Sequence, residues 1–148
     1  MWYRVFGNDA AVEPAAFLQH LHGTGLEIET RFGADDQGWF RAELRLPAEE
    51  EPILLQRYLA IEAGIRAELN TWAAWLEALP DDPVHHALMQ RIVFSRQVFT
   101  LQREPEENAQ AELCLTVCRY LSGVTEGVYQ VDGQGFFDSA GVLLVKED

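Results

Sequence analysis

The stretch PILLQRYLAIEAGIRAELNTWAAWLEALP, residues 52–80, decides the fold that we predict for this chain. Its apolar side chains recur at alternating steps of three and four residues, which places them on one stripe of an α-helix. Pro52 suits the first position of a helix, and Pro80 ends one. We therefore predict a single amphipathic helix from Ile53 to Leu79, about seven turns long. The stripe consists of Leu54, Tyr58, Ile61, Ile65, Leu69, Trp72, Leu76 and Leu79.

Two positions inside this predicted helix favour a break. Gly64 lowers helix stability, and Asn70 with Thr71 belongs to the residue types that prefer caps to helix interiors. The pattern leaves open whether the helix is continuous or is broken near Gly64 or Asn70.

The sequence before the long helix predicts a strand, a helix and a hairpin. Residues 2–6 have the aromatic and β-branched side chains of a short strand. A helix is predicted to open at Pro14 and to run through His22, with a glycine directly after it as terminator. Residues 26–32 and 39–46 alternate apolar and polar side chains, which is typical of an antiparallel hairpin with one buried and one solvated face.

The sequence after the long helix predicts two more helices and a set of short strands. Asp82 suits an N-cap, and the proline that follows it opens a helix that we extend to about Gln102. Residues 98–101 are β-prone, so a strand at this end is the alternative. A further helix is predicted from about Ala109 to Leu121, and residues 128–146 predict a β-meander with glycine-containing turns.

These elements predict an α+β fold in a single domain over residues 1–148. The sheet is expected to be antiparallel with helices packed mainly on one face, in the order βαββ-ααα-ββ. That order is compatible with a ferredoxin-like arrangement extended by extra helices. Apolar residues make up 48% of the chain, which suits a substantial core.

Charge and cysteine content narrow the classes of function. The formal net charge of −13 lacks the basic footprint of a nucleic-acid-binding protein and disfavours docking on an anionic membrane. We find neither a secretory leader nor a run of about 20 apolar residues that could span a bilayer. Cys114 and Cys118 lie four apart on a predicted helix, where they suit buried thiols better than a disulfide. A cytoplasmic protein is predicted.

No catalytic or cofactor-binding motif stands out in the sequence. His85 and His86 follow two aspartates, but adjacent helical residues diverge by about 100°, so the pair predicts no metal site. The glycines near residue 133 lie between strands and do not make a phosphate-binding loop. We therefore predict no cofactor and no metal, and we favour a non-enzymatic protein while leaving an enzyme open.

The solvated face of the predicted hairpin is the first candidate for a binding surface. It carries Arg31, Trp39, Arg41 and Arg45, and the favoured function is recognition of another protein through these side chains. Trp39 is the exception on a charged face, so another part of the chain covers it or a partner does. We favour coverage by the C-terminal strands.

Two alternatives remain open from the sequence. The first is a small-molecule-binding protein or an enzyme with a cleft between the long helix and the sheet. The second is a homo-oligomer that assembles through a sheet edge or an exposed helical stripe. The residues predicted to line the cleft are Tyr58, Trp72, Trp75, His85 and His86.

One resemblance extends over most of the chain. The C-terminal pattern from Thr125 to Phe137, together with residues 38–40, 66–72 and 96–101, resembles a small group of uncharacterised bacterial proteins. The resemblance implies no catalytic residues, because that group has no known activity to transfer. The C-terminal pattern is also loosely similar to the ends of immunity-like bacterial proteins, in which a strand pair packs beside the preceding helix.

Overall fold

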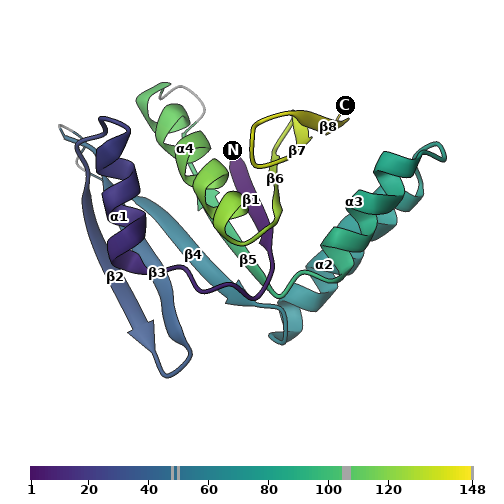
Figure 1. Cartoon of the computed structure of the whole chain (residues 1–148), viewed down its shortest axis with the longest axis horizontal. Coiled ribbons are helices and arrows are strands. Elements are labelled where there is room, and N and C mark those ends of the chain that lie inside the picture. Colours follow the sequence, from purple (N-terminus) through teal and green to yellow (C-terminus); the bar gives the residue numbers. More distant parts are fainter. Residues whose placement is uncertain (48, 50, 105–107, 148) are drawn as a thin grey trace.

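An antiparallel sheet of eight strands, in the order β2-β3-β4-β5-β1-β6-β7-β8, runs through the computed structural model of this chain (Figure 1). The structure describes residues 1–47, 49, 51–104 and 108–147. Together with the helices, the sheet confirms the predicted α+β class. The elements in chain order are β1 (Trp2–Gly7), α1 (Pro14–Gly23), β2 (Glu29–Asp35), β3 (Gly38–Arg45), β4 (Ile53–Leu59), α2 (Ala63–Glu77), α3 (Pro83–Val93), β5 (Gln97–Gln102), α4 (Asn108–Val124), β6 (Val128–Val131), β7 (Gly135–Phe137) and β8 (Leu143–Lys146).

The prediction of one helix from Ile53 to Leu79 is wrong over its first part. Residues 53–59 form β4, which pairs with β3 and β5, and α2 begins only at Ala63. Ile53 and Leu55 are buried whereas Leu54 is exposed, so these residues follow the two-residue period of a strand. A short run of consecutive apolar residues fits a helix and a strand equally well, and here pairing with two neighbouring strands decides between them.

The second predicted helix also contains a strand. α3 ends at Val93, and residues 97–102 form β5 between β4 and β1. The predicted N-cap is confirmed, since the backbone N–H of Val84 donates to the Asp82 carboxylate over 2.7 Å. The β-branched and aromatic residues of 98–101 are almost fully buried in the sheet, and this burial favours the strand over an extension of the helix.

The helices lie on both faces of the sheet rather than mainly on one. α1 and α4 cover the first face, where Tyr3 and Val5 of β1 join one hydrophobic cluster (Figure 1). Phe6 points to the opposite face and joins a second cluster with residues of α2 and α3. Because β1 and β5 bury apolar side chains on both faces of the sheet, both faces need cover.

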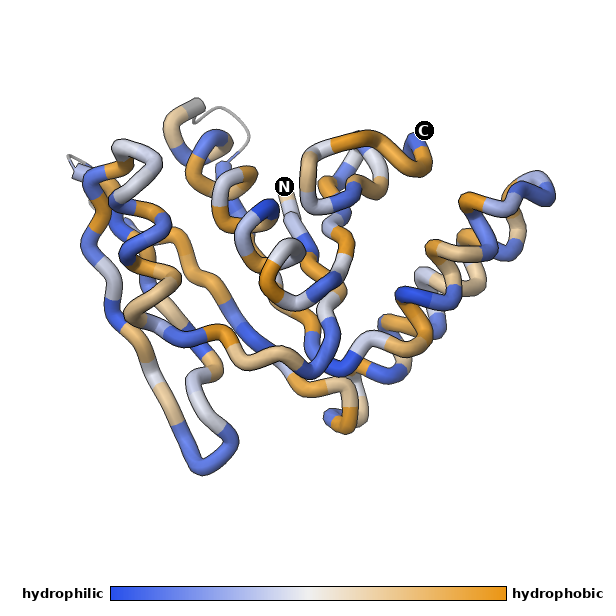
Figure 2. The backbone as a smooth tube through the Cα atoms, viewed as in Figure 1, coloured by the Kyte–Doolittle hydropathy of each residue, from blue (hydrophilic) through white to orange (hydrophobic). Residues whose placement is uncertain are grey.

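The strand order differs from a ferredoxin-like arrangement. β1 pairs with β5 and β6, and the β2–β3 hairpin lies at the edge of the sheet, with β4 and β5 between it and β1. The tip of the hairpin extends beyond α1, and Figure 2 shows that this tip is hydrophilic. The hairpin therefore has one face that neither α1 and α4 nor α2 and α3 cover.

Candidate functional site

The three arginines predicted for the binding surface share one exposed face. Ala42 and Leu44 of β3 are fully buried in the first hydrophobic cluster, beneath α1 and α4. Alternate residues of β2 and β3 therefore point to the opposite side, which we call the outer face. Arg31, Arg41 and Arg45 are all exposed on it. The cluster beneath α2 and α3 is built at the other end of the sheet and includes residues of β6, β7 and β8.

Two of these arginines face carboxylates across the hairpin. Arg31 of β2 is opposite Glu43 of β3, and Glu29 of β2 is opposite Arg45 of β3. Opposite charges at such positions stabilise a strand pair modestly, by about 0.2–1 kcal/mol. The alternation of charge that was visible in the sequence therefore serves the hairpin itself.

Arg41 differs from the other two arginines because no carboxylate lies directly across from it. Its partners in the neighbouring strands are Gly33 and Gln56. Phe40, which precedes it, is 43% exposed, and Leu54 on β4 is 39% exposed. The outer face therefore presents Arg41, with no carboxylate directly across from it, next to the exposed Phe40, and Leu54 adds an apolar side chain opposite Glu43.

Trp39 does not belong to the outer face, and its predicted place there is wrong. The residue is only 7% exposed, and its indole N–H donates to the Val12 carbonyl over 2.8 Å. Its ring packs against the rings of Phe32 and Phe99, with the Arg57 guanidinium 6.0 Å from its centre. Trp39 is thus covered, but by the segment before α1 and by neighbouring strands rather than by the C-terminal strands.

A β-bulge explains why the alternation reverses at this position. Arg41 is paired with Gly33 and Trp39 with Ala34, so Phe40 is the additional residue between two consecutive pairs. An extra residue shifts the side-chain alternation by one, which turns Trp39 inward and Phe40 outward. A methyl group added at Gly33 would lie 3.6 Å from the Phe40 ring, so this ring rests on the outer face of β2. Gly33, which is paired with Arg41 next to the bulge, is a sequence signal that could have indicated it.

The aromatic residues predicted for the alternative cleft fill a core instead. The rings of Trp72 and Trp75 pack on Phe136, with centroid distances of 5.5 and 6.0 Å. Tyr58 packs against the same cluster, and its hydroxyl donates to the Gln56 side chain over 2.9 Å. These side chains join α2 to the sheet.

The two histidines of that predicted cleft lie elsewhere. His85 and His86 line a small hollow of about 280 Å³ beside the α2–α3 turn, which does not include the three aromatic residues. A ring nitrogen of His85 is 2.9 Å from the Pro80 carbonyl, and His86 pairs with Asp81. Both contacts are local to the turn, so the structure does not bring the five predicted residues together.

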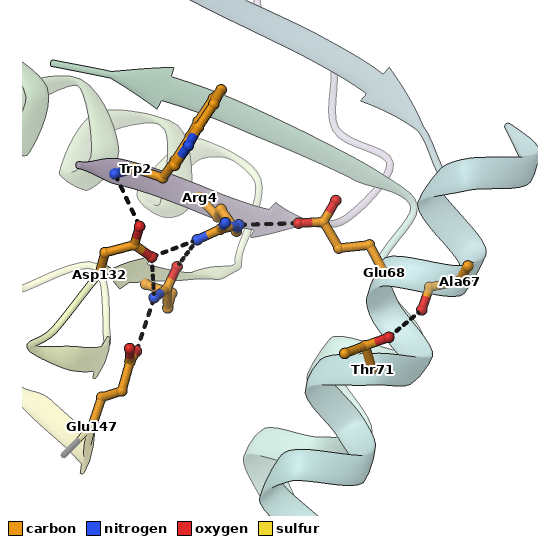
Figure 3. A network of polar contacts seen from close by, with 8 residues as sticks. Trp2, Arg4, Ala67, Glu68, Thr71, Asp132 and Glu147 are labelled. Atoms are coloured by element: carbon orange, nitrogen blue, oxygen red, sulfur yellow. Dashed lines mark hydrogen bonds and ion pairs between the residues drawn. The ribbon is translucent and has the colours of Figure 1, made fainter.

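A polar cluster centred on Arg4 connects β1 to α2 and β6 (Figure 3). The Arg4 guanidinium donates to Glu68 over 3.0 Å, to Gln130 over 2.8 Å and to Asp132 over 2.7 Å. It also lies 5.3 Å from the centre of the Trp72 ring. The Arg4 side chain is only 17% exposed. Most of its N–H donors form hydrogen bonds with these partners.

The same cluster also holds the C-terminal strand region. The Gln130 amide donates to Asp132 over 3.1 Å and to Glu147 over 3.0 Å, and the backbone N–H of Trp2 donates to Asp132 over 3.1 Å. Within the described part of the chain, no buried side-chain nitrogen or oxygen lacks a hydrogen-bond partner. The cluster therefore acts as a satisfied structural junction.

Asp132 is the acidic group whose ionisation this junction changes most clearly. Burial alone would raise its pKa, but hydrogen bonds from Gln130, Arg4 and the Trp2 backbone together lower the pKa below 3.8. The carboxylate therefore stays ionised at neutral pH, whereas a general acid needs a pKa near the working pH.

The lowered pKa of Asp132 predicts a dependence of stability on pH. Its folded-state pKa lies below its unfolded-state value, so the stabilisation is complete above the ordinary value of 3.8 and is lost as pH falls below it. We expect Asp132→Asn to lower the urea midpoint at pH 7, and the difference from the wild type to shrink below about pH 4. A difference that stays constant down to pH 2.5 or so would contradict this assignment.

A wider hollow of about 1040 Å³ lies between α3 and the turn that leads from α4 to β6. Its walls include the exposed Phe94 and the buried Leu88. Two of the charged side chains that line it form hydrogen bonds within the fold. Arg91 donates to the Glu126 carbonyl, and Asp138 accepts from two backbone N–H groups of its own turn. The rest of its lining mixes apolar side chains with polar ones such as Asn8 and Gln90, and among the described residues it shows no cluster of converging polar groups that would mark a reactive centre.

The cysteines and metal-ligating side chains of the described residues form no reactive centre. Burial raises the pKa of the Cys114 thiol to about 12, and burial also raises that of Cys118. Both thiols are free and fully buried, which confirms their predicted place in the core. Among the described residues, no group of three or more His, Cys, Asp or Glu side chains could hold a metal ion.

Comparisons with known proteins do not place the chain in a family. No protein-family model matches it, and no curated protein and no solved structure matches it either. The resemblance to uncharacterised bacterial proteins therefore stays a prediction. None of the helices in the described ranges is long and apolar enough to cross a membrane.

Proposed function

We propose that this chain is a non-enzymatic protein that binds another protein through the outer face of β2, β3 and β4. The observation that carries the proposal is the exposed Phe40 beside Arg41, whose charge no residue directly across the sheet compensates. Aromatic residues and arginine dominate the energetically important centres of protein interfaces. Leu54 extends the apolar area on the neighbouring strand.

The charges define the chemistry of the partner. The chain carries 11 basic residues against 24 acidic ones, whereas on this face the three arginines outnumber Glu29 and Glu43, so Arg41 is the excess charge. An acidic partner surface would be repelled by most of the molecule and attracted here. The guanidinium of Arg41 suits a carboxylate, which it can bind through two parallel hydrogen bonds. We therefore expect a partner surface with a carboxylate next to an apolar pocket for Phe40.

The proposed setting is the cytoplasm. Two free thiols in a chain without a disulfide among its described residues fit a reducing compartment. Interfaces of this polar and aromatic kind belong to proteins that associate reversibly in solution.

A quantitative pull-down tests the proposal. Tagged wild type, Phe40→Ala/Arg41→Glu and a matched control, Ile61→Ala/Arg96→Glu, are used as baits in lysate of the native cell. Ile61 is 89% exposed and Arg96 is exposed, so the control removes the same kinds of groups away from the outer face. We expect at least one protein to be recovered with the wild type and the control, and lost with the outer-face variant.

The recovered protein is then purified and its affinity for the three baits is measured at low and high salt. Loss of a central aromatic residue and a paired arginine should weaken binding by about 3 kcal/mol or more, which is over 100-fold. Equal affinity of the outer-face variant and the wild type, with equal thermal stability, would rule out this surface.

A further inference from the structure

The two edges of the sheet differ in how they are protected. β8 forms one edge with four residues and carries Lys146, the only lysine of the chain. β2 forms the other edge with seven residues and contains neither proline nor lysine. Short strands, lysine, proline and β-bulges are means by which an edge avoids pairing with another chain, and the bulge of this hairpin lies beyond Gly33 of β2. β2 is therefore the edge that remains available for pairing.

The backbone of β2 has one partner strand. Residues 29–35 pair with β3, and among the described residues their backbone groups form no hydrogen bond outside this hairpin; the Asp35 side chain only accepts from the Gln37 N–H within the turn. Every second residue of an edge strand directs its N–H and C=O away from the sheet. The part of β2 before the bulge, up to Gly33, is the regular part on which another strand could pair.

We propose that two copies of this chain pair through β2 as antiparallel strands, around a two-fold axis at Thr30. In this register Thr30 is opposite its own copy, and Glu29 of each chain is opposite Arg31 of the other. The outer faces of the two sheets then lie on the same side, and both cross-strand pairs join opposite charges. The strand complements itself, as a two-fold interface requires.

Other registers of β2 are less favourable. A two-fold axis at Glu29 or at Arg31 places two like charges directly opposite each other, which destabilises a strand pair. An axis at Phe32 places Glu29 of one chain opposite Asp35 of the other, again two like charges. An axis at Gly33 coincides with the position where pairing with β3 shifts. The pleat excludes intermediate positions, because residues that face each other must point to the same side of the sheet. Thr30 is therefore the centre that the charges select.

The net charge of the chain gives this association a specific salt dependence. Each copy carries −13, so two copies repel each other over long range. The residues of the hairpin contribute little to this repulsion, since Arg31, Arg41 and Arg45 offset most of its acids. Added salt screens the long-range repulsion more than the close Glu29–Arg31 contacts. We expect the dimer to strengthen as salt rises from low to moderate concentration.

Cysteine crosslinking tests the register directly. Three variants, Thr30→Cys, Glu29→Cys and Arg31→Cys, are oxidised mildly, with Cys114 and Cys118 retained because both are fully buried. Cα atoms of directly opposite residues lie about 4.5–5.5 Å apart, which is within disulfide range. In the proposed register the two copies of residue 29 would be about 8 Å apart, and so would the two copies of residue 31. We expect Thr30→Cys to form a crosslinked dimer, and Glu29→Cys and Arg31→Cys to form none when each is tested alone.

A mixture of the Glu29→Cys and Arg31→Cys chains provides the matched positive control. In the proposed register these two cysteines face each other, so the mixture should crosslink where each chain alone does not. Stronger crosslinking at residue 29 or 31 alone, or similar crosslinking of all three variants, would overturn the register.

Sedimentation equilibrium of the unmodified chain tests the association itself. The expected result is a concentration-dependent rise from 16.8 kDa to twice that mass, greater at moderate than at low salt. A mass of one chain at every concentration and salt would overturn the proposal. Phe40→Ala/Arg41→Glu should leave this mass unchanged, since neither residue takes part in the proposed strand pair. The proposed dimer and the proposed partner surface can therefore be disproved independently of each other.

Discussion

Replacing Phe136 with alanine should lower the free energy of unfolding by about 3–5 kcal/mol. The side chain is fully buried, and the rings of Phe6, Trp72 and Trp75 lie around it at centroid distances between 5.5 and 6.0 Å. Removing this ring leaves a cavity lined by three large, stiff side chains that cannot collapse into it easily. The loss would loosen the attachment of α2 to β1 and β7.

Urea unfolding followed by circular dichroism measures this effect. Phe94→Ala is the matched control, because Phe94 is 71% exposed and loses the same atoms. The control should change the free energy of unfolding by no more than about 0.5 kcal/mol. Similar losses for the two variants would mean that the second hydrophobic cluster is not packed around Phe136.

The parts of the fold that the sequence predicted correctly have local signals. α1 begins at its proline, the β2–β3 hairpin shows the alternation of a half-buried strand pair, and α3 begins directly after the Asp82 cap. Each of these signals depends on a few neighbouring residues. They were sufficient for the α+β class and for the antiparallel hairpin.

The strand β4 was missed, and β5 was predicted only as the alternative to a helix end, because the evidence for both strands is not local. β4 and β5 lie between other strands, and the apolar runs of residues 53–55 and 98–101 suit a buried strand or a buried helix. Their identity is decided by pairing of Leu55 with Leu101, two residues far apart in the chain. Once these strands are in the sheet, the connections place helices on both faces.

In the candidate site, the direction of the Trp39 side chain also depends on strand pairing that the local sequence does not reveal. The alternation of β3 placed Trp39 with Arg41 and Arg45, and the three arginines are indeed exposed together. The bulge at Phe40 exchanges the two aromatic side chains, so the exposed one is the phenylalanine. A bulge of this kind depends on register with the neighbouring strand and is hard to infer from one strand alone.

Arg4→Met should destabilise the protein by about 2–3 kcal/mol, somewhat less than the 3–5 kcal/mol typical when one member of a fully buried ion pair is removed. The discount applies because the Glu68 and Asp132 side chains are 34% and 36% exposed and recover part of their hydration. Methionine keeps the apolar length that packs on Trp72, so the loss measures the missing hydrogen bonds and charge. Urea unfolding at pH 7 provides the measurement.

A double-mutant cycle with Glu68→Gln separates the junction from simple loss of packing. In the wild type, Glu68→Gln removes the negative charge that strengthens the hydrogen bond from Arg4 and should destabilise the protein. In the Arg4→Met background the same change removes a carboxylate that has lost this partner, so it should cost nothing or restore stability. Additive losses would show that Glu68 and Arg4 act independently, and α2 would then be held on the sheet by its apolar contacts rather than by this ion pair.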